Sequence, residues 1–197
     1  MRLRKAEERD VIPLLALING YAQRNLLLHR TEESLRARLA DFLVAEEEGE
    51  VVGGGALSEL GPGLGEVRSL AVRQDQAGHG IGRRIVEALL AQAGERGFVE
   101  VLALTRRVAF FEALGFTVTR RERFLDKLQT DCKHCPLNLC CDETAVSHRV
   151  APRALAAAPR GMQHPQEITL PLGRASFGSP SEQTGPAVGV AEKEDSE

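Results

Sequence analysis

The sequence predicts an α/β domain built on a mixed β-sheet, and three observations support this fold class. Residues 67–72 form an apolar, strand-like run, a glycine-rich turn follows it, and residues 81–90 then carry apolar side chains at helical spacing. Residues 98–104 form a second apolar run after that helix. A strand, a long helix and another strand of similar character form a parallel β-α-β unit. With 197 residues, 43% of them hydrophobic, the chain has room for one ordinary domain and a tail.

The residues before this unit are expected to supply an edge strand and two helices. The short edge strand contains Leu3. Asp10 or a nearby acid opens the first helix, where Pro13 is tolerated in the first turn and Asn19-Gly20 ends or loosens the helix. Thr31 is the expected N-cap of the second helix. The inward-facing apolar residues of the two helices are Val11, Leu14, Leu15, Leu17, Ile18, Leu35 and Leu39.

A hairpin is expected next. It joins a strand at Phe42–Ala45 to a returning strand at Val51–Leu57 through a turn at Glu48–Glu50. Three consecutive glycines, residues 53–55, stand inside the returning strand. Glycine is unusual in a strand interior and marks a bulge or the close approach of another backbone or a ligand.

The second half of the domain is expected to end near Thr119. Its elements are a strand at Glu66–Arg73, a helix from about Ile81 to Ala93 that closes at Gly94 or Gly97, a strand at Phe98–Leu104, a short helix at Val108–Leu114 ended by Gly115, and a strand at Phe116–Thr119. From about Val150 onward, Ala, Pro, Gly, Ser and Gln dominate and apolar periodicity disappears. We expect this tail, residues 150–197, to be disordered.

The glycine-rich turn, residues 76–84, is typical of a phosphate cradle at a helix N-terminus. Gly78, Gly80 and Gly82 tolerate positive φ and let the backbone approach an anion closely. The free N–H groups at the helix start face that anion, and the helix dipole favours its negative charge. A turn without a ligand is the alternative. A P-loop is excluded because Arg83-Arg84 follow the last glycine, and a dinucleotide-binding loop needs one more residue between its glycines.

Composition gives no sign of a nucleic-acid or membrane partner. The formal net charge is -3, and no apolar run reaches the length of a transmembrane helix. The N-terminus lacks the hydrophobic core of a signal peptide. We therefore expect a cytoplasmic protein, in which the four cysteines are thiols or metal ligands rather than disulfides.

Several motifs resemble the GNAT acetyltransferases. Gly80 and Gly82 match the glycines of that family's acyl-CoA loop, Q/R-x-x-G-x-G/A, although Ala77 stands at its first position, next to Gln76. Residues 110–116, F-F-E-A-L-G-F, resemble the family's Y/F-Y/F-E-x-x-G-F segment, and the hairpin at residues 51–57 resembles its G-x-x-V-G strands. This resemblance covers residues 1–121 and implies the GNAT fold, in which splayed central parallel strands flanked by helices open a cleft for acetyl-CoA.

A narrower resemblance points to the acceptor. Residues 27–35, 65–72 and 104–106 are similar to the acetyltransferase domain of N-acetylglutamate synthases. Residues 131–145 resemble the C-terminal segment of short members of that group, which lack an amino-acid kinase domain. The resemblance implies an amino-acid N-acetyltransferase that makes N-acetyl-L-glutamate from acetyl-CoA and L-glutamate, the entry to arginine biosynthesis.

The same resemblance assigns roles to individual residues. It implies that the pyrophosphate of acetyl-CoA sits on the main chain of the loop and that the pantetheine arm lies along the preceding strand. The residues concerned are Leu70, Ala71, Val72, Ala77, Gly78, His79, Gly80, Ile81 and Gly82. Glu66 is the candidate base for the attacking amine, with a solvated strand-end acid as the alternative. Phe110 and Phe111 stand where many GNAT enzymes have a tyrosine acid, so no general acid is identified.

A dicarboxylate acceptor needs at least two cationic anchors, and arginine pairs with a carboxylate through its planar fork. Arg30 and Arg106 fall where the resemblance implies glutamate-binding arginines. Arg68 alternates onto the same strand face as Glu66 and is a third candidate. Each of them is otherwise a surface charge. The family's L-T-T-R-S segment is replaced here by L-T-R-R, which leaves open whether Arg106 or Arg107 is the anchor.

The cysteines follow a C-x2-C-x4-C-C pattern with His134 inside it. The four are Cys132, Cys135, Cys140 and Cys141. Four soft ligands favour a tetrahedral Zn²⁺ site, with an iron–sulfur cluster or packed reduced thiols as alternatives. Adjacent cysteines bind one ion with poor geometry, and His134 is a substitute ligand. We therefore divide the chain into an acetyltransferase domain (residues 1–125), a Cys-rich extension (residues 126–149) and the tail.

Two other functions remain open. One keeps the fold and changes the acceptor to another small amine or to a protein N-terminus. The other is a non-catalytic acyl-CoA or metal-binding sensor, favoured by the missing tyrosine and the cysteine cluster. Because GNAT proteins often pair, the resemblance also implies a homodimer.

Overall fold

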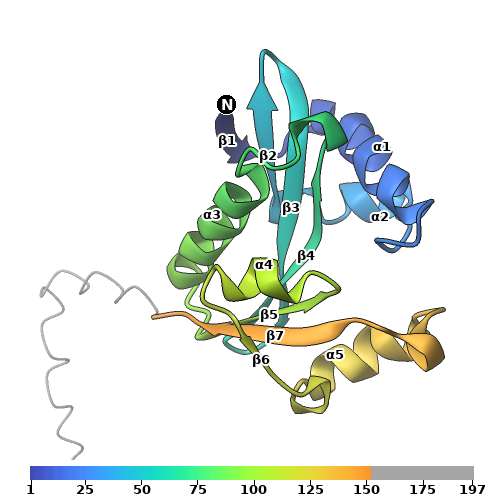
Figure 1. The fold of residues 1–197 in the computed structure, drawn as a ribbon, viewed down its shortest axis with the longest axis vertical. Helices are drawn as coiled ribbons and strands as arrows, with labels where there is room; N and C mark the ends of the chain where they lie inside the picture. The colour runs from blue at the N-terminus through green and yellow to red at the C-terminus, as the bar shows by residue number, and fades with distance from the viewer. Residues whose placement is uncertain (152–197) are drawn as a thin grey trace, which may run out of the picture. The chain divides into compact units, whose positions relative to one another are not determined.

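The structure, a computed structural model, describes residues 1–151 and contains one seven-stranded sheet with helices on both faces (Figure 1). The strand order is β1-β2-β3-β4-β5-β7-β6, in which only β4 and β5 pair in parallel. The strands are β1 (Arg2–Lys5), β2 (Phe42–Glu47), β3 (Glu50–Gly61), β4 (Leu64–Val72), β5 (Glu100–Thr105), β6 (Thr117–Val118) and β7 (Thr144–Arg149). The helices are α1 (Val11–Ala22), α2 (Glu32–Arg36), α3 (Ile81–Glu95), α4 (Val108–Glu112) and α5 (Leu125–Thr130). The predicted tail lies outside the described residues from residue 152 onward.

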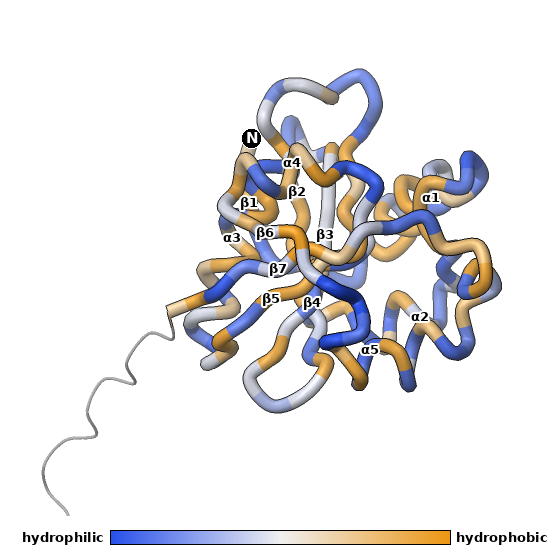
Figure 2. Tube along the Cα trace, turned by 60° about the horizontal axis from the view of Figure 1, so that its bottom comes forward, coloured by the Kyte–Doolittle hydropathy of each residue, from blue (hydrophilic) through white to orange (hydrophobic). Residues whose placement is uncertain are grey.

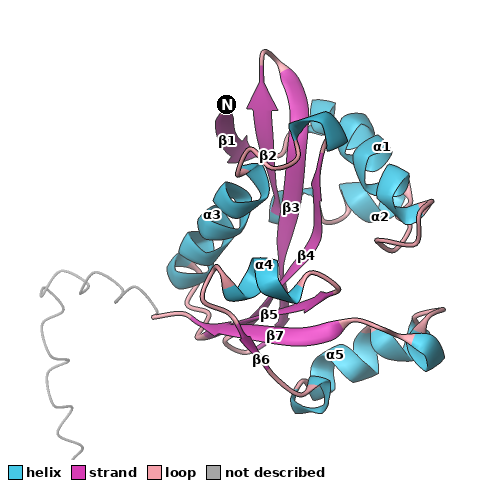
Figure 3. Ribbon diagram, viewed as in Figure 1, coloured by secondary structure: helices cyan, strands magenta, loops and turns pink. Residues whose placement is uncertain are grey.

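Two hydrophobic clusters fix the helices to the sheet. One gathers around Ile85 and Leu89 of α3, and the other gathers around Leu14 of α1 and Leu35 of α2. The two helix groups cover opposite sides of β3 and β4 (Figure 3). Both hydrophobic and hydrophilic residues occur along α3 (Figure 2), as they do in helices with one buried face. α1 is mostly apolar, and its buried residues are Val11, Leu14 and Ile18.

The three glycines of β3 lie where both helices come close to the sheet. A Cβ atom at Gly53 or Gly55 would lie 3.1 Å from Ile85 of α3, and a Cβ atom at Gly54 would lie 2.5 Å from Leu14 of α1. The register with β4 also shifts between Gly54 and Ala56. The prediction of a bulge or a close approach is therefore confirmed, and the approaching groups are helix side chains on both faces.

Local signals predicted most elements correctly. The β2–β3 hairpin turns through Glu48 and Gly49, both with positive φ (52° and 85°), as a two-residue hairpin requires. Thr31 caps α2, because its Oγ1 accepts a hydrogen bond from the Ser34 N–H at 3.1 Å. Asn19-Gly20 does not end α1, which continues to Ala22.

The structure adds α5 and β7, which the sequence did not predict. β7 pairs antiparallel with β5 along six residues, from Thr105↔Thr144 to Glu100↔Arg149, and β6 pairs on its other side. β7 is short and half polar, so its own sequence gives little strand signal. Pairing with β5 and β6 holds it as a strand. The chain after β6 thereby returns to lie beside β5.

An ion cluster fixes the N-terminal strand to the start of α1. Arg4 donates to both carboxylate oxygens of Asp10, at 2.6 and 2.9 Å, and also to Glu46. Asp10 is 2% exposed and also accepts the Glu7 N–H at 2.7 Å. The hydrogen bond from Arg4 holds the pKa of Asp10 below its ordinary value of 3.8, against the effect of burial.

Replacing Asp10 with Asn should lower the free energy of unfolding by about 1–3 kcal/mol at pH 7, because Arg4 loses a charged acceptor. The lowered pKa means that this stabilisation is complete above pH 3.8 and is lost as the pH falls through the folded-state pKa. Urea unfolding at pH 7 and pH 3 measures both effects. The difference between the wild type and Asp10→Asn should shrink at pH 3, and an equal difference at both pH values would contradict this.

No helix in the described part of the chain is long and apolar enough to cross a membrane.

Candidate active site

The parallel strands β4 and β5 separate along their length. They pair only at Leu64↔Glu100, Gly65↔Val101 and Glu66↔Leu102, after which β5 continues beside β7 alone. Ser69 of β4 has a φ of 53°, a left-handed conformation that non-glycine residues rarely adopt. It lies in the bulge where Ser69 and Leu70 stand between the pairs Ala56↔Arg68 and Gly54↔Ala71. A strained residue at a splayed strand is typical of a functional site.

The predicted phosphate loop follows β4 and opens α3. Gly78 and Gly80 have φ values of 85° and 76°, and a Cβ atom at either would meet nothing within 4 Å. Within the described chain, the backbone N–H groups of residues 78–83 have no hydrogen-bond acceptor, and the first N–H bond of the helix comes from Arg84 to Gly80. Ala77, Gly78, His79 and Gly80 are exposed, and the Ile81 side chain is buried. The turn therefore leaves backbone donors free at the start of α3, and the binding of a phosphate by them stays a prediction.

The residues of β4 before this loop have their side chains in or against the core. Ala71 is buried, and Leu70 and Val72 pack against the cluster around α3. The Val72 carbonyl accepts the hydroxyl of Tyr21 at 2.6 Å. The Tyr21 hydroxyl is therefore held against β4 and does not line the cavity described next.

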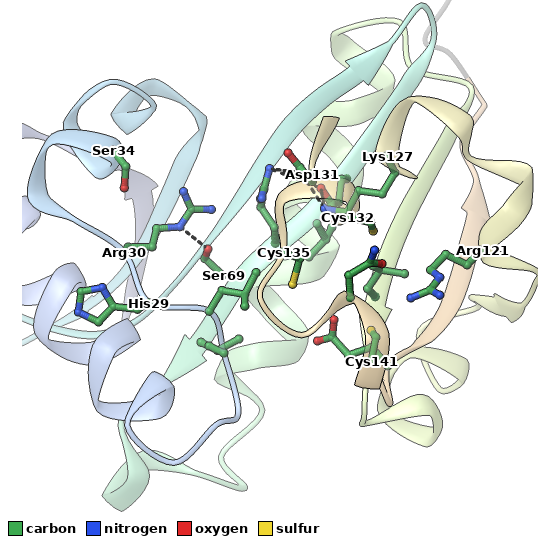
Figure 4. Close-up of a pocket in the computed structure, with 18 residues that line it drawn as sticks. His29, Arg30, Ser34, Ser69, Arg121, Lys127, Asp131, Cys132, Cys135 and Cys141 are labelled. Carbon is green, nitrogen blue, oxygen red and sulfur yellow. Dashed lines mark hydrogen bonds and ion pairs between the residues drawn. The ribbon is translucent and has the colours of Figure 1, made fainter. Parts of the chain in front are cut away.

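A cavity of about 230 Å³ opens at the splay of β4 and β5. Its walls come from the segment before α2, from β4 and β5, and from residues 121–143 (Figure 4). Its charged side chains, with histidine neutral, carry an excess of one positive charge. They are Arg30, Arg68, Arg121 and Lys127 against Glu66, Asp131 and Glu143.

Arg30 faces this cavity with much of its guanidinium free. Asn19 holds its backbone through two hydrogen bonds of 2.9 Å, and its Nε donates to Ser69 Oγ at 2.9 Å. Arg30 forms no ion pair with any carboxylate among residues 1–151. Burial, followed by the neighbouring charge of Arg68, lowers its pKa. An anion in the cavity would relieve both penalties, so the role of Arg30 as an anion-binding residue stays a prediction that this environment favours.

Glu66 lies in the same cavity, 3% exposed, and is part of a four-residue ion network. Lys127 Nζ lies 2.7 Å from its Oε1 and 2.9 Å from its Oε2, and Arg68 Nη1 lies 3.6 Å from Oε2. Asp131 accepts from Lys127 at 2.8 Å and pairs with Arg68 at 3.1 Å. Burial disfavours the Asp131 carboxylate, but these two cations outweigh it and lower the pKa of Asp131. The network is neutral. The remaining charged side chains of the cavity are the cations Arg30 and Arg121, which form no ion pair within residues 1–151, and the acid Glu143, which lies 3.8 Å from Arg106.

Arg106 lies outside the cavity lining. Its Nε donates to Asp142 at 2.7 Å, which raises its pKa, and its Nη1 lies 3.8 Å from Glu143. Arg107 is exposed, and its N–H donates to Thr105 Oγ1. The structure thus brings together Glu66, Arg30 and Arg68 of the predicted set and leaves Arg106 paired beside them.

Four charged cavity residues were not identified as site residues from the sequence: Arg121, Lys127, Asp131 and Glu143. All of them follow α4, in a region where the sequence predicted no helix. Burial raises the pKa of Glu143, against the charge of Arg106. The apolar spacing of Phe124 and Leu128 was the available signal for α5, the helix that carries Lys127.

The predicted zinc site is not supported. Within residues 1–151, no group of three or more His, Cys, Asp or Glu side chains is arranged to hold a metal ion. Cys132 and Cys135 lie at one short turn, and Cys140 and Cys141 lie at another, with Cys132 buried and Cys140 exposed. The physical reason is that the four cysteines are divided between two short turns, one thiol buried and another exposed, and do not gather around one point. They are free cysteines.

The chain has relatives among known proteins. The model of the acetyltransferase (GNAT) family matches residues 12–116. An uncharacterized N-acetyltransferase from Chlorobaculum tepidum is 35% identical over 144 residues, which is 73% of this chain and 93% of that protein. An amino-acid acetyltransferase from Mycobacterium tuberculosis is 39% identical over 118 residues, 58% of this chain and 67% of that protein. The chain spans only 27% of a longer amino-acid acetyltransferase from Shewanella oneidensis, with 30% identity.

Solved structures show the same architecture. The Mycobacterium tuberculosis protein Rv2747, in complex with CoA and the ligand NLQ, aligns with a TM-score of 0.68 and 29% identity, over 76% of this chain and 99% of that one. N-acetylglutamate synthase from Neisseria gonorrhoeae, complexed with coenzyme A and N-acetyl-glutamate, aligns with a TM-score of 0.69 and 23% identity, over 76% of this chain and 35% of that one. These likenesses confirm the predicted fold class.

Proposed function

The chain belongs to the acetyltransferase (GNAT) family, and from this we propose that it transfers the acetyl group of acetyl-CoA to the α-amino group of L-glutamate. The product, N-acetylglutamate, feeds arginine biosynthesis. The observation that carries the proposal is the cavity at the strand splay, where an unpaired Arg30 and a buried Glu66 face the same space.

The donor half of the proposal rests on the loop and on β4. The N–H groups of residues 78–83 hold the pyrophosphate of acetyl-CoA at the start of α3. The pantetheine arm then follows the unpaired edge of β4 past Leu70, Ala71 and Val72 toward the cavity. Because the Val72 carbonyl is taken by Tyr21, the arm uses other main-chain groups of this strand. The structure of the similar protein Rv2747 in complex with CoA supports this donor.

The acceptor half of the proposal rests on the charge of the cavity. L-glutamate carries two carboxylates and one ammonium group, a net charge of about -1 at neutral pH. This matches the cavity's excess of one positive charge. Arg30 binds one carboxylate through its free guanidinium donors, and Arg68 or Arg121 binds the other. The M. tuberculosis and S. oneidensis relatives named as amino-acid acetyltransferases support an amino-acid acceptor.

Acetyl transfer then needs a neutral amine beside the thioester. Glu66, whose carboxylate lies against Lys127 and Arg68, takes a proton from the ammonium group directly or through a water molecule. The amine attacks the thioester carbonyl, whose developing negative charge is met by main-chain N–H groups of β4. The tetrahedral intermediate collapses and releases CoA as a thiolate. The cavity walls contribute mainly by holding the amine and the thioester together.

A substitution in the loop tests the donor half. Gly80→Ala forces an alanine into a φ of 76°, which costs roughly 1–2 kcal/mol, and should raise the KM for acetyl-CoA by about tenfold. Gly20→Ala is the matched control, because Gly20 lies in α1 with nothing within 4 Å of a Cβ atom. Steady-state kinetics at saturating glutamate measures the effect. Equal acetyl-CoA KM values for Gly80→Ala and the wild type would contradict the cradle.

The function itself is tested by an acceptor panel. The protein is incubated with acetyl-CoA and each of the common amino acids, several small amines and short peptides, and thiol release is followed. L-glutamate should give the highest kcat/KM. Turnover that is fastest with a monoamine or a peptide N-terminus would replace glutamate by that acceptor, and CoA binding without turnover on any acceptor would favour a sensor.

A further inference from the structure

Three cysteine thiols line the acceptor cavity, and acetyl transfer uses none of them. Cys132, Cys135 and Cys141 contribute to its wall, while Cys140 is exposed and lies outside the lining. Figure 4 shows the three lining cysteines on the side of the cavity opposite Arg30. All four are free thiols. The cavity therefore holds free thiol groups at the place where the acceptor is proposed to bind.

Cys132 and Cys135 are arranged so that they can be bridged. Cys132 begins the 3-10 turn Cys132–His134, Cys135 directly follows it, and the Cys135 N–H donates to the Cys132 carbonyl at 3.1 Å. Such a turn brings the first and fourth Cα atoms within about 7 Å. A disulfide needs a Cα separation of about 4.4–6.8 Å. The backbone between these two cysteines thus already meets the main requirement for a bridge.

The two thiols differ in their surroundings, and this difference determines which of them an oxidant reaches first. Cys132 is buried, and burial raises its pKa, although the charges of Lys127 and Arg121 oppose this. It therefore remains a protonated thiol. Cys135 is half-buried at the cavity wall, so an oxidant that enters the cavity reaches it first.

The turn is coupled to the ion network around Glu66. Asp131, the residue directly before Cys132, binds Lys127 at 2.8 Å and Arg68 at 3.1 Å, and both of these cations contact Glu66. A bridge between Cys132 and Cys135 joins two side chains of the cavity wall and constrains the turn that directly follows Asp131. We expect this to change the shape of the cavity and to shift the contacts of Asp131 with Lys127 and Arg68.

We propose that Cys132 and Cys135 form a reversible disulfide when a hydroperoxide oxidises the protein, and that this bridge closes the acceptor cavity. The Cys135 thiol gives up its proton and its sulfur attacks one oxygen of hydrogen peroxide. The O–O bond breaks, the other oxygen leaves with that proton as water, and a sulfenic acid remains. The Cys132 thiol then attacks that sulfur and displaces a second water molecule. In total, two thiols and one hydrogen peroxide give one disulfide and two waters. The effect on activity rests on the proposed acetyltransferase function, whereas the bridge itself does not.

The experiment treats the full-length reduced protein with hydrogen peroxide, digests it without reduction, and maps disulfides by mass spectrometry. Cys132 and Cys135 should be found linked. In parallel, kcat/KM for glutamate should fall by about 10- to 100-fold, because small misplacement of positioning groups costs that much. Dithiothreitol should restore it, and binding of acetyl-CoA without acceptor should be unchanged.

Two variants separate this bridge from other oxidation. Cys135→Ser should keep its glutamate kcat/KM after peroxide, whereas Cys140→Ser, which alters a thiol outside the cavity lining, should lose activity as the wild type does. A bridge mapped to Cys140 or Cys141, no bridge at all, or equal loss of activity in Cys135→Ser would each overturn the inference. Absence of turnover in the reduced protein would instead count against the proposed function, and the disulfide map would still decide the bridge.

Discussion

Replacing Glu66 with Gln should lower kcat for glutamate acetylation by about 10²- to 10⁴-fold, the usual contribution of a general base. Glutamine fills the same space in the cavity but cannot accept the proton of the acceptor's ammonium group. The KM for acetyl-CoA should stay unchanged, because the phosphate loop follows the other end of β4. Steady-state kinetics with each substrate varied in turn measures both constants.

A structural role for Glu66 predicts a different pattern. Glu66 also holds Lys127 of α5, so Glu66→Gln is expected to lower the melting temperature. Lys127→Met breaks the same ion pair but keeps the carboxylate, and it should retain far more turnover than Glu66→Gln. Glu59→Gln, which changes an exposed acid of β3, is the matched control. Equal kcat losses in Glu66→Gln and Lys127→Met would show that the ion pair, and not the base, is what matters.

Replacing Arg30 with Ala should raise the KM for glutamate by about 10²- to 10³-fold, since removal of one partner from a buried charge pair typically costs 2–5 kcal/mol. Arg30 is the cavity cation whose backbone is fixed by Asn19 and whose guanidinium has no carboxylate partner within the described chain. The substrate carboxylate is then its only counter-ion. The KM for acetyl-CoA should not change.

Arg30→Lys should recover only part of the loss, because an ammonium group keeps the charge but not the planar fork. Arg38→Ala is the matched control, since it removes an exposed positive charge beyond the end of α2 that does not line the cavity. Melting temperatures of all three variants exclude a loss of fold. A glutamate KM for Arg30→Ala equal to that of Arg38→Ala would contradict the assignment.

The sequence was most informative where local structure depends on residues that are neighbours in the chain. Positive φ at Gly78 and Gly80, the Thr31 cap and the apolar spacing of α3 all follow from local backbone preferences and periodicity. The same local rules predicted the parallel pair of strands and the loop between them. The fold class and the conformation of the glycine-rich turn could therefore be predicted from the order of residues.

The acceptor side of the cavity could not be derived in this way. Glu66 and Lys127 are 61 positions apart. They meet because the chain after β6 returns to the splay through α5 and then through β7, which pairs with β5. The same return leads Arg106 to pair with Asp142 instead of lining the cavity. No local signal in β7 or α5 specified these contacts.

What the sequence determined by itself is the mixed sheet, the glycine cradle and the identity of the ionisable residues available for chemistry. What only the tertiary structure decided is which charges neutralise one another and which remain free. Long-range pairing in the sheet sets those distances, and the energy of a buried charge depends on its partners in space rather than on its neighbours in the chain.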